Sequence, residues 1–271
     1  MLRPEVIEGR SGRLLSVVHA PGAVPAVGAI VVAPPFAEEM NKSRRMITLF
    51  AQAAAQGGFE TVVPDLTGTG DSDGEFADAR WDDWSDDLER VLAAARRRTG
   101  RAPILLAIRS GALLASSVLE RDPYAARALL LWAPVTNGDR FMKQFLRLRM
   151  AASLSQAQRE TVADLETALR AGAPVEVAGY ALAPALWTAI VASKFAPPAP
   201  AGGGRVGWFE VAAAEPYELS PASQKSAGAL AQLGWQVDAS AIGGAAFWGT
   251  AEIAEVPELV AASAAALDGM R

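Results

Sequence analysis

Cysteine is absent from this chain of 271 residues, and histidine occurs only once, at His19. Without thiols the protein can form no disulfide, zinc–thiolate site or iron–sulfur cluster. A single histidine matters as much, because most acid–base enzymes that work near neutral pH use one. We therefore expect no cofactor and no metal, and we expect any catalysis to depart from the usual histidine chemistry.

Blocks of like charge and long apolar runs are also missing. The formal net charge is −5, and the lysines and arginines are scattered along the chain, unlike the basic grooves that bind nucleic acid. No window reaches about 18 uninterrupted apolar residues, and the first residues lack the apolar core of a signal peptide. We expect a cytoplasmic protein with no transmembrane segment and no nucleic-acid partner.

Short apolar runs alternate with helix-length segments along the chain. Several runs, such as ILLAI (104–108), are apolar throughout, which is typical of strands covered on both faces of a sheet. The alternation predicts an α/β fold with a doubly wound, mainly parallel sheet. The predicted strands are 14–19, 29–32, 61–63, 104–108, 128–132, 206–211 and 236–239, and the predicted helices are 43–56, 81–98 and 111–120.

About 70 residues separate the predicted strands 128–132 and 206–211, too many for a plain crossover. We interpret the chain as a single domain, 1–271, with a helical cap inserted at about 137–204. In the cap, Phe141, Phe145 and Leu148 recur at helical spacing and are expected to pack over a pocket. Three tryptophans are expected in the core or the pocket wall: Trp187, Trp208 and Trp248.

Ligands of open parallel sheets bind beyond the carboxyl ends of the strands. The loop 33–45 contains two prolines, and Asn41 or Ser43 is predicted to cap the helix that follows. The glycine-rich loop 64–74 contains Asp65, which we expect to hold its turn. A sharp turn lies within 104–115, and the loop 211–221 carries Glu215.

These loops carry a family resemblance. The layout of strand, DLTGTGDS (65–72), helix, strand and tight turn is similar to that of the α/β-hydrolases. PPFAEEMNKSRRM (34–46), AIRSGALLA (107–115) and FWGTAEIAEVPEL (247–259) resemble, more narrowly, the exosortase A system-associated hydrolase 2 group. That resemblance spans about 14–267. It implies an α/β-hydrolase fold and a bacterial hydrolase that accompanies exopolysaccharide and PEP-CTERM sorting loci.

The nucleophile position departs from the α/β-hydrolase pattern. These enzymes place a serine at the apex of a strand-to-helix elbow, with small residues two before and two after it. With Arg109 at the apex, Ala107 and Gly111 occupy those positions, whereas with Ser110 there, bulky Ile108 occupies one of them. The spacing favours Arg109 at the apex and makes Ser110 an ordinary residue at the start of the helix.

The histidine base is missing as well. In the resembled family it follows the last strand, where Ala245 or Ala246 stands here. His19 lies near the end of an early strand, which we expect to be remote from the elbow, and Glu215 occupies the position of the acid. Loss of serine or histidine from such a triad costs on the order of a million-fold in turnover. A Ser–His–acid mechanism is therefore not expected.

An arginine at the elbow would point into the pocket beneath the cap and would need a partner there. One interpretation is an internal ion pair, for instance with Glu38 or Glu215, that closes a dead site. In another, Arg109 and the helix amides bind a carboxylate or a phosphate. A third makes a carboxylate such as Glu38 the base or nucleophile. The candidate partners of Arg109 are Glu38, Glu39, Asp65, Glu215 and Glu252.

Two functions remain open from the sequence. The first is a divergent hydrolase with a degenerate triad, whose candidate catalytic residues are Arg109, Ser110, Glu38 and Glu215. The alternative is a non-catalytic pseudo-hydrolase that binds a small anionic molecule or a protein partner. The candidate ligand-binding residues are Arg109, Ser110, Glu38, Glu39 and Phe36.

Overall fold

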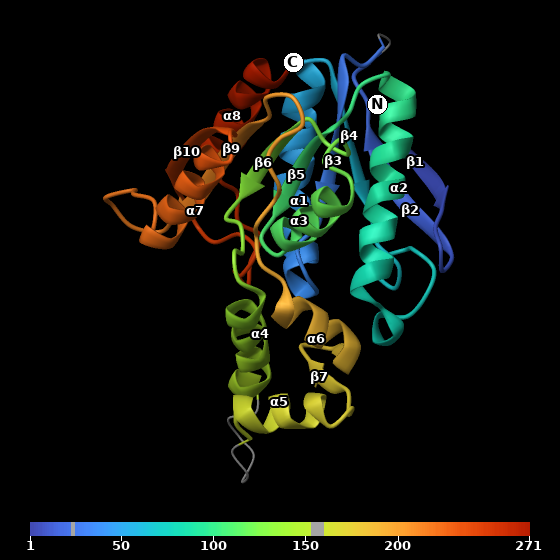
Figure 1. The fold of residues 1–271 in the computed structure, drawn as a ribbon, viewed down its shortest axis with the longest axis vertical. Helices are drawn as coiled ribbons and strands as arrows, with labels where there is room; N and C mark the ends of the chain where they lie inside the picture. The colour runs from blue at the N-terminus through green and yellow to red at the C-terminus, as the bar shows by residue number, and fades with distance from the viewer. Residues whose placement is uncertain (23–24, 153–159) are drawn as a thin grey trace.

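The structure, a computed structural model, describes residues 1–22, 25–152 and 160–271. In these residues one eight-stranded sheet has the order β1-β2-β4-β3-β5-β6-β9-β10, and β2 runs antiparallel to both β1 and β4. The fold is that of an α/β-hydrolase, as the sequence predicted (Figure 1). The strands of this sheet are β1 (Leu2–Glu8), β2 (Arg13–His19), β3 (Gly28–Ala33), β4 (Phe59–Pro64), β5 (Ile104–Ile108), β6 (Ala128–Trp132), β9 (Arg205–Ala212) and β10 (Gln236–Gly243).

The central strands are buried on both faces, which explains their unbroken apolar sequences. In β5, Leu105 and Ala107 belong to one hydrophobic core cluster, whereas Ile104, Leu106 and Ile108 belong to another on the opposite face. Helices α1 and α8 pack on the face with the second cluster, and α2, α3 and α7 pack on the other face. The helices are α1 (Glu38–Gln56), α2 (Trp81–Thr99), α3 (Gly111–Arg121), α4 (Gly138–Ala152), α5 (Val162–Arg170), α6 (Pro184–Ala192), α7 (Pro221–Gln232), α8 (Pro257–Ala266) and two 3₁₀ turns, η1 (Phe76–Asp78) and η2 (Leu267–Met270).

All seven predicted strands are present, but β1 and the short hairpin of β7 (Val175–Val177) and β8 (Tyr180–Leu182) were not predicted. Strand β1 lies at the edge of the sheet, and its residues alternate between exposed and partly buried. Pro4 and the charged residues of this segment interrupt any apolar run, so no signal marked it. Pairing with β2 along its whole length is what makes it a strand.

The prediction that Asn41 or Ser43 caps the first helix is wrong. Helix α1 begins five residues earlier than Ser43, at Glu38, and its N-cap Ala37 has φ 52° and makes no side-chain capping bond. Ser43 lies inside the helix and donates from its hydroxyl to the carbonyl of Glu39 at 2.7 Å. The acidic first turn suits the helix dipole, and the loop geometry sets the start of the helix.

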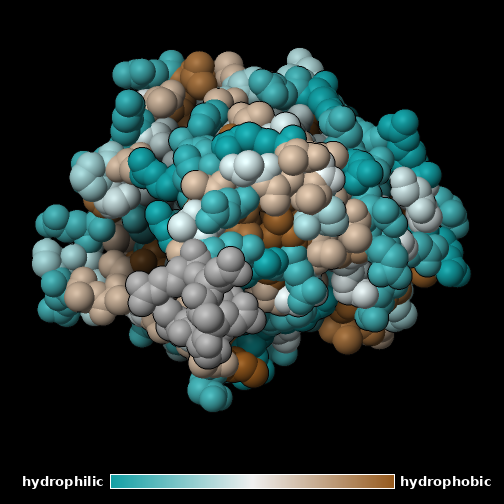
Figure 2. Space-filling view, turned by 90° about the horizontal axis from the view of Figure 1, so that it is seen from below, coloured by the Kyte–Doolittle hydropathy of each residue, from teal (hydrophilic) through white to brown (hydrophobic). Residues whose placement is uncertain are grey.

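Between β6 and β9 the chain forms α4, α5, the β7–β8 hairpin and α6, which lie together at one end of the molecule (Figure 1). We call residues 137–204 the cap segment. Phe141 and Phe145 of α4 are buried, whereas Leu148 is 41 % exposed, and all three line one cavity, as predicted. Seen from the cap end, the surface is mostly hydrophilic, with hydrophobic residues visible in the middle of the face (Figure 2). Of the helices described, none is long and apolar enough to cross a membrane.

Candidate functional site

The elbow lies at the carboxyl end of β5, in the centre of the sheet. Arg109 has φ 53°, and Ser110, with φ −64°, is the N-cap of α3. The left-handed residue at the apex of the elbow is therefore Arg109. This is the register that the small residues Ala107 and Gly111 predicted. The Arg109 amide donates to the carbonyl of Trp132 at 3.0 Å, and its own carbonyl accepts from Val135 at 3.0 Å. These bonds to the end of β6 hold a backbone conformation that is costly for a residue with a Cβ.

Backbone strain is concentrated around this elbow. Ala37, Arg109 and Ala133, which follow β3, β5 and β6, all have positive φ although none is glycine. A left-handed conformation costs a non-glycine residue roughly 1–3 kcal/mol, and such residues cluster at functional sites. Three neighbouring strand ends thus hold unfavourable backbone at the same place, which marks this edge of the sheet as the candidate site.

The Arg109 guanidinium is held on three sides. Nε and Nη2 donate to Glu39 Oε1 at 3.3 and 3.2 Å, and Nη1 donates to the carbonyl of Ala133 at 3.1 Å. The ring of Trp248 packs against the guanidinium, with Cζ 4.6 Å from the ring centroid. These bonds use three of the five guanidinium N–H groups. Two N–H groups make no bond within the described chain and remain available to a ligand.

The partner of Arg109 is Glu39, not Glu38 or Glu215 as the ion-pair interpretation had suggested. The side chains of Arg109 and Glu39 are only 17 % and 12 % exposed. Burial raises the pKa of Glu39 to about 7, although the Arg109 charge and hydrogen bond oppose that rise. Burial also raises the pKa of the neighbouring Glu38. One oxygen of each carboxyl, Oε2, is buried without a hydrogen-bond partner in the described part of the chain.

A hydrogen bond joins the side chain of Ser110 to the backbone of Phe36. The amide of Phe36, in the loop after β3, donates to Ser110 Oγ at 3.0 Å. Both residues are almost fully buried. In this position the serine hydroxyl satisfies a loop amide that would otherwise be buried without a partner, and the Phe36 amide is not available to a bound ligand.

The other predicted site residues lie away from Arg109. Glu215 is exposed in the loop after β9, and no interaction in the described residues joins it to Arg109. The predicted ion pair of Glu215 with Arg109 is therefore wrong, because Glu215 is exposed and Arg109 pairs with Glu39. Its place as the acid stays a prediction. Glu252 is exposed too. His19 ends β2, which is separated from β5 by β4 and β3 and runs antiparallel to β4, so it lies at the opposite edge of the sheet.

The loop after β10 nevertheless reaches the elbow. Ala245 and Ala246, at the position predicted for the missing histidine, are exposed, but Trp248 of the same loop contacts Arg109. Trp248 is thus pocket wall, as predicted, and Trp187 and Trp208 are core. An indole face beside a guanidinium contributes roughly 0.5–2 kcal/mol of attraction.

Asp65 holds its loop, as expected. Its Oδ2 accepts from the Asp71 amide at 3.0 Å and its Oδ1 accepts from Arg44 at 2.9 Å. Buried Asp87 of α2 supports the same loop by accepting from the Thr67 amide at 2.8 Å. Asp65 therefore makes no bond to Arg109 in the described chain. Nor do the described residues contain any group of three His, Cys, Asp or Glu placed to hold a metal.

Arg109 lines a cavity of about 300 Å³ between the sheet and α4. Arg140 of α4 also lines it, is exposed, and forms no ion pair among the described residues. Glu210 adds a carboxylate, which accepts from the Ser220 amide at 2.9 Å. No sequence pattern marks Arg140 or Glu210 as site residues, because only the fold brings α4 and β9 beside the elbow. The site can therefore surround a small polar molecule with two guanidinium groups and one carboxylate.

Comparison with known proteins agrees with this architecture. The family described as serine aminopeptidase, S33 matches residues 25–194. Est1E from Butyrivibrio proteoclasticus, solved with ferulic acid bound, is 13 % identical with a TM-score of 0.68, over 98 % of this chain and 99 % of that one. XC6422 from Xanthomonas campestris, a serine hydrolase without a lid, is 16 % identical with a TM-score of 0.58, over 99 % and 94 %. No curated protein sequence matches.

Proposed function

This chain belongs to the Hydrolase_4 family, serine aminopeptidase S33, and we propose that it binds a small anionic molecule at Arg109 instead of forming an acyl-serine intermediate. The observation that carries the proposal is a guanidinium at the elbow apex that lines a polar cavity and keeps two N–H groups unused. Arginine binds carboxylates and phosphates through paired N–H donors. With Arg140 beside it, the cavity favours a ligand that carries negative charge.

Loss of the elbow charge should weaken this binding. We expect Arg109→Gln to weaken the binding of a small carboxylate or phosphate by roughly 10- to 100-fold, the usual effect of a lost charge-assisted hydrogen bond. Isothermal titration calorimetry with acetate, citrate, inorganic phosphate and a sugar phosphate measures this directly.

The matched control is Arg97→Gln, which removes the same charge from an exposed position at the end of α2. Equal affinities in the wild-type protein and the Arg109 variant, or an equal loss in both variants, would contradict the proposal.

We further propose that the ligand belongs to the exopolysaccharide and sorting system with which the exosortase A-associated group is found, and that the protein works in the cytoplasm. The support is that the residues most typical of that group, 34–46, form the loop after β3 and the first turns of α1. This segment contributes Glu39, the ion-pair partner of Arg109, to the site. Preferential binding of a sugar phosphate over acetate would favour this assignment, and the reverse order would count against it.

A second candidate function is hydrolysis that depends on Glu39. The observation that favours it is a carboxyl with a pKa of about 7 and one unpaired, buried oxygen, in a residue that lines a cavity with Glu38 and Trp248. A general base works best with a pKa near the operating pH. In this mechanism Glu39 would take a proton from water, and Arg109 would hold the anionic product.

Ser110 separates these mechanisms from an acyl-serine route. We expect Ser110→Ala to leave any hydrolysis of aryl esters and thioesters unchanged, because the hydroxyl accepts from the Phe36 amide and no histidine lies near it. The variant should lose roughly 1–3 kcal/mol of stability, because that amide is left without a partner. If activity disappears in Ser110→Ala but persists in Glu39→Gln, the acyl-serine route operates after all.

A further inference from the structure

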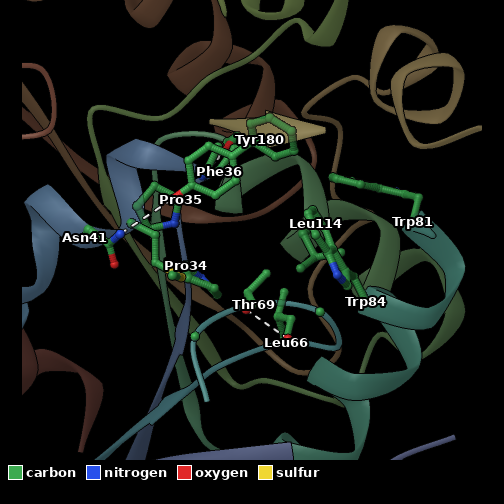
Figure 3. A pocket seen from close by; sticks show the side chains of 15 residues that line it. Pro34, Pro35, Phe36, Asn41, Leu66, Thr69, Trp81, Trp84, Leu114 and Tyr180 are labelled. Carbon is green, nitrogen blue, oxygen red and sulfur yellow. Dashed lines mark hydrogen bonds between the residues drawn. The ribbon is translucent and has the colours of Figure 1, made fainter. Parts of the chain in front are cut away.

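A second cavity, of about 130 Å³, lies on the other side of the loop after β3. Figure 3 shows the side chains that line it, which come from segments far apart in the sequence: this loop, the glycine-rich loop after β4, the start of α2, α3 and β8. Its lining shares no residue with the cavity at Arg109. We call it the aromatic cavity, and its principal lining residues are Phe36, Leu66, Trp81, Trp84, Leu114 and Tyr180.

Phe36 forms the wall toward α4. Its ring centroid lies 5.0 Å from that of Phe145 and 6.0 Å from that of Phe141, and both of these residues line a further cavity together with Glu38 and Glu39. On its other side the ring packs against Trp84 at 5.9 Å. Edge-to-face contacts of this kind stabilise a fixed ring position. The aromatic cavity is therefore separated from the charged groups at the elbow.

The polar atoms of the wall are already paired. Trp84 Nε1 donates to the carbonyl of Thr67 at 2.9 Å, and Trp81 Nε1 donates to Ser117 Oγ at 3.0 Å. Thr69 Oγ1 donates to the carbonyl of Leu66 at 2.8 Å. None of the lining residues is Asp, Glu, Lys, Arg or His. Asn41 Nδ2 donates to Tyr180 Oη at 3.5 Å, and Ser110 Oγ, which also lines the cavity, accepts from the Phe36 amide. A bound molecule thus meets mainly ring faces and methyl groups.

The walls are held in place before any ligand arrives. Pro34 and Pro35 restrict the loop after β3. The glycine-rich loop is fixed by the bonds of Asp65 and Asp87 described above. A Cβ on Gly68, whose φ is 75°, would lie 2.6 Å from the carbonyl oxygen of Glu75, so the backbone passes too closely for any other residue. A rigid, preformed cavity binds without a large ordering cost.

We propose that the aromatic cavity is a binding site for a neutral aromatic ring or a compact aliphatic group of similar size. Apolar cavities of about 150 Å³ in other proteins remain free of water and bind benzene or xenon, so this volume admits one six-membered ring. The lining disfavours an anion, because no cation is present to pair with it. The site is separate from Arg109 and does not depend on the function proposed there.

Fluorobenzene, observed by ¹⁹F NMR, tests this site in the full-length protein. We expect it to bind the wild-type protein and the volume-conserving control Leu114→Met with similar affinity. Leu114 is 2 % exposed and lines the cavity. In Leu114→Phe the new ring fills the space, and the affinity should fall by at least about tenfold. Benzoate should not displace fluorobenzene, and Arg109→Gln should not change its affinity.

Xenon locates the site without any variant, in case Leu114→Phe does not fold. Crystals of the wild-type protein under xenon pressure should show an anomalous peak among Phe36, Trp84 and Leu114. The proposal fails if fluorobenzene does not bind, if it binds Leu114→Phe as tightly as wild type, or if xenon occupies only other places. Displacement by benzoate would likewise overturn the preference for a neutral ligand.

Discussion

Gly111→Ala is expected to destabilise the protein by roughly 2–4 kcal/mol, the range for a forced overlap in a closely packed interior. A Cβ on Gly111 would overlap the carbonyl oxygen of Ala33 and lie 2.9 Å from that of Pro34. Both are backbone atoms of β3 and the loop after it, so neither can move without shifting the elbow. Urea denaturation followed by circular dichroism measures the loss.

The comparison variant is Gly228→Ala. Gly228 lies within α7, where an added Cβ meets no atom within 4 Å. Alanine in a helix interior is favoured over glycine by about 1 kcal/mol, so this variant should be slightly more stable than wild type. If both variants changed stability in the same direction and by the same amount, close packing at the elbow would not be the cause.

The second large effect concerns the pH dependence of stability, which Glu39 should dominate. Its pKa rises from 4.5 to about 7 on folding, mainly through burial and against the opposing effect of Arg109. The folded state therefore binds this proton more tightly than the unfolded state. The resulting stability is fully present below about pH 4.5 and is lost as the pH rises through about 7. A pKa rise of this size corresponds to about 3 kcal/mol.

Glu39→Gln removes this titration but keeps an oxygen that accepts from Arg109. The free energy of unfolding of the variant, relative to that of wild type, should increase by up to about 3 kcal/mol when the pH is raised from about 5 to about 8. The nearby Glu38 carboxyl also raises the pKa of Glu39, whereas the charge of Lys42 lowers it. The pKa of Glu38 is itself raised by burial. Urea titrations at both pH values measure the change, with Glu120→Gln, an exposed position on α3, as the control. Curves for wild type and Glu39→Gln that stay parallel with pH would show that Glu39 is ionised in both states.

The same titration bears on ligand binding at Arg109. A bound anion lies near Glu39, so it favours the protonated carboxyl. Affinity for a small anion should therefore rise as the pH falls through about 7. The pH dependence of anion affinity, measured by calorimetry, and that of stability, measured in urea, should therefore share a midpoint at about pH 7.

The sequence by itself determined seven strands of the sheet, the elbow register and the absence of histidine from the site. Unbroken apolar runs require strands covered on both faces, and small residues at 107 and 111 are needed wherever strand and helix backbones meet. Such signals are local, so they can be read from the chain. The resemblance to the exosortase A-associated group also came from local segments, and it remains a proposal.

Only the tertiary structure decided which groups face Arg109. Glu38, Glu39 and Glu215 were equally acidic candidates in the sequence, but the strained Ala37 starts α1 early and turns Glu39 toward the elbow, whereas Glu215 points to solvent. Trp248 and Arg140 also lie beside Arg109 in the fold, although the loop and the helix that carry them are distant from it in sequence. Side-chain neighbours across loops depend on backbone angles and helix starts, and a shift of one residue at either changes which side chain points inward.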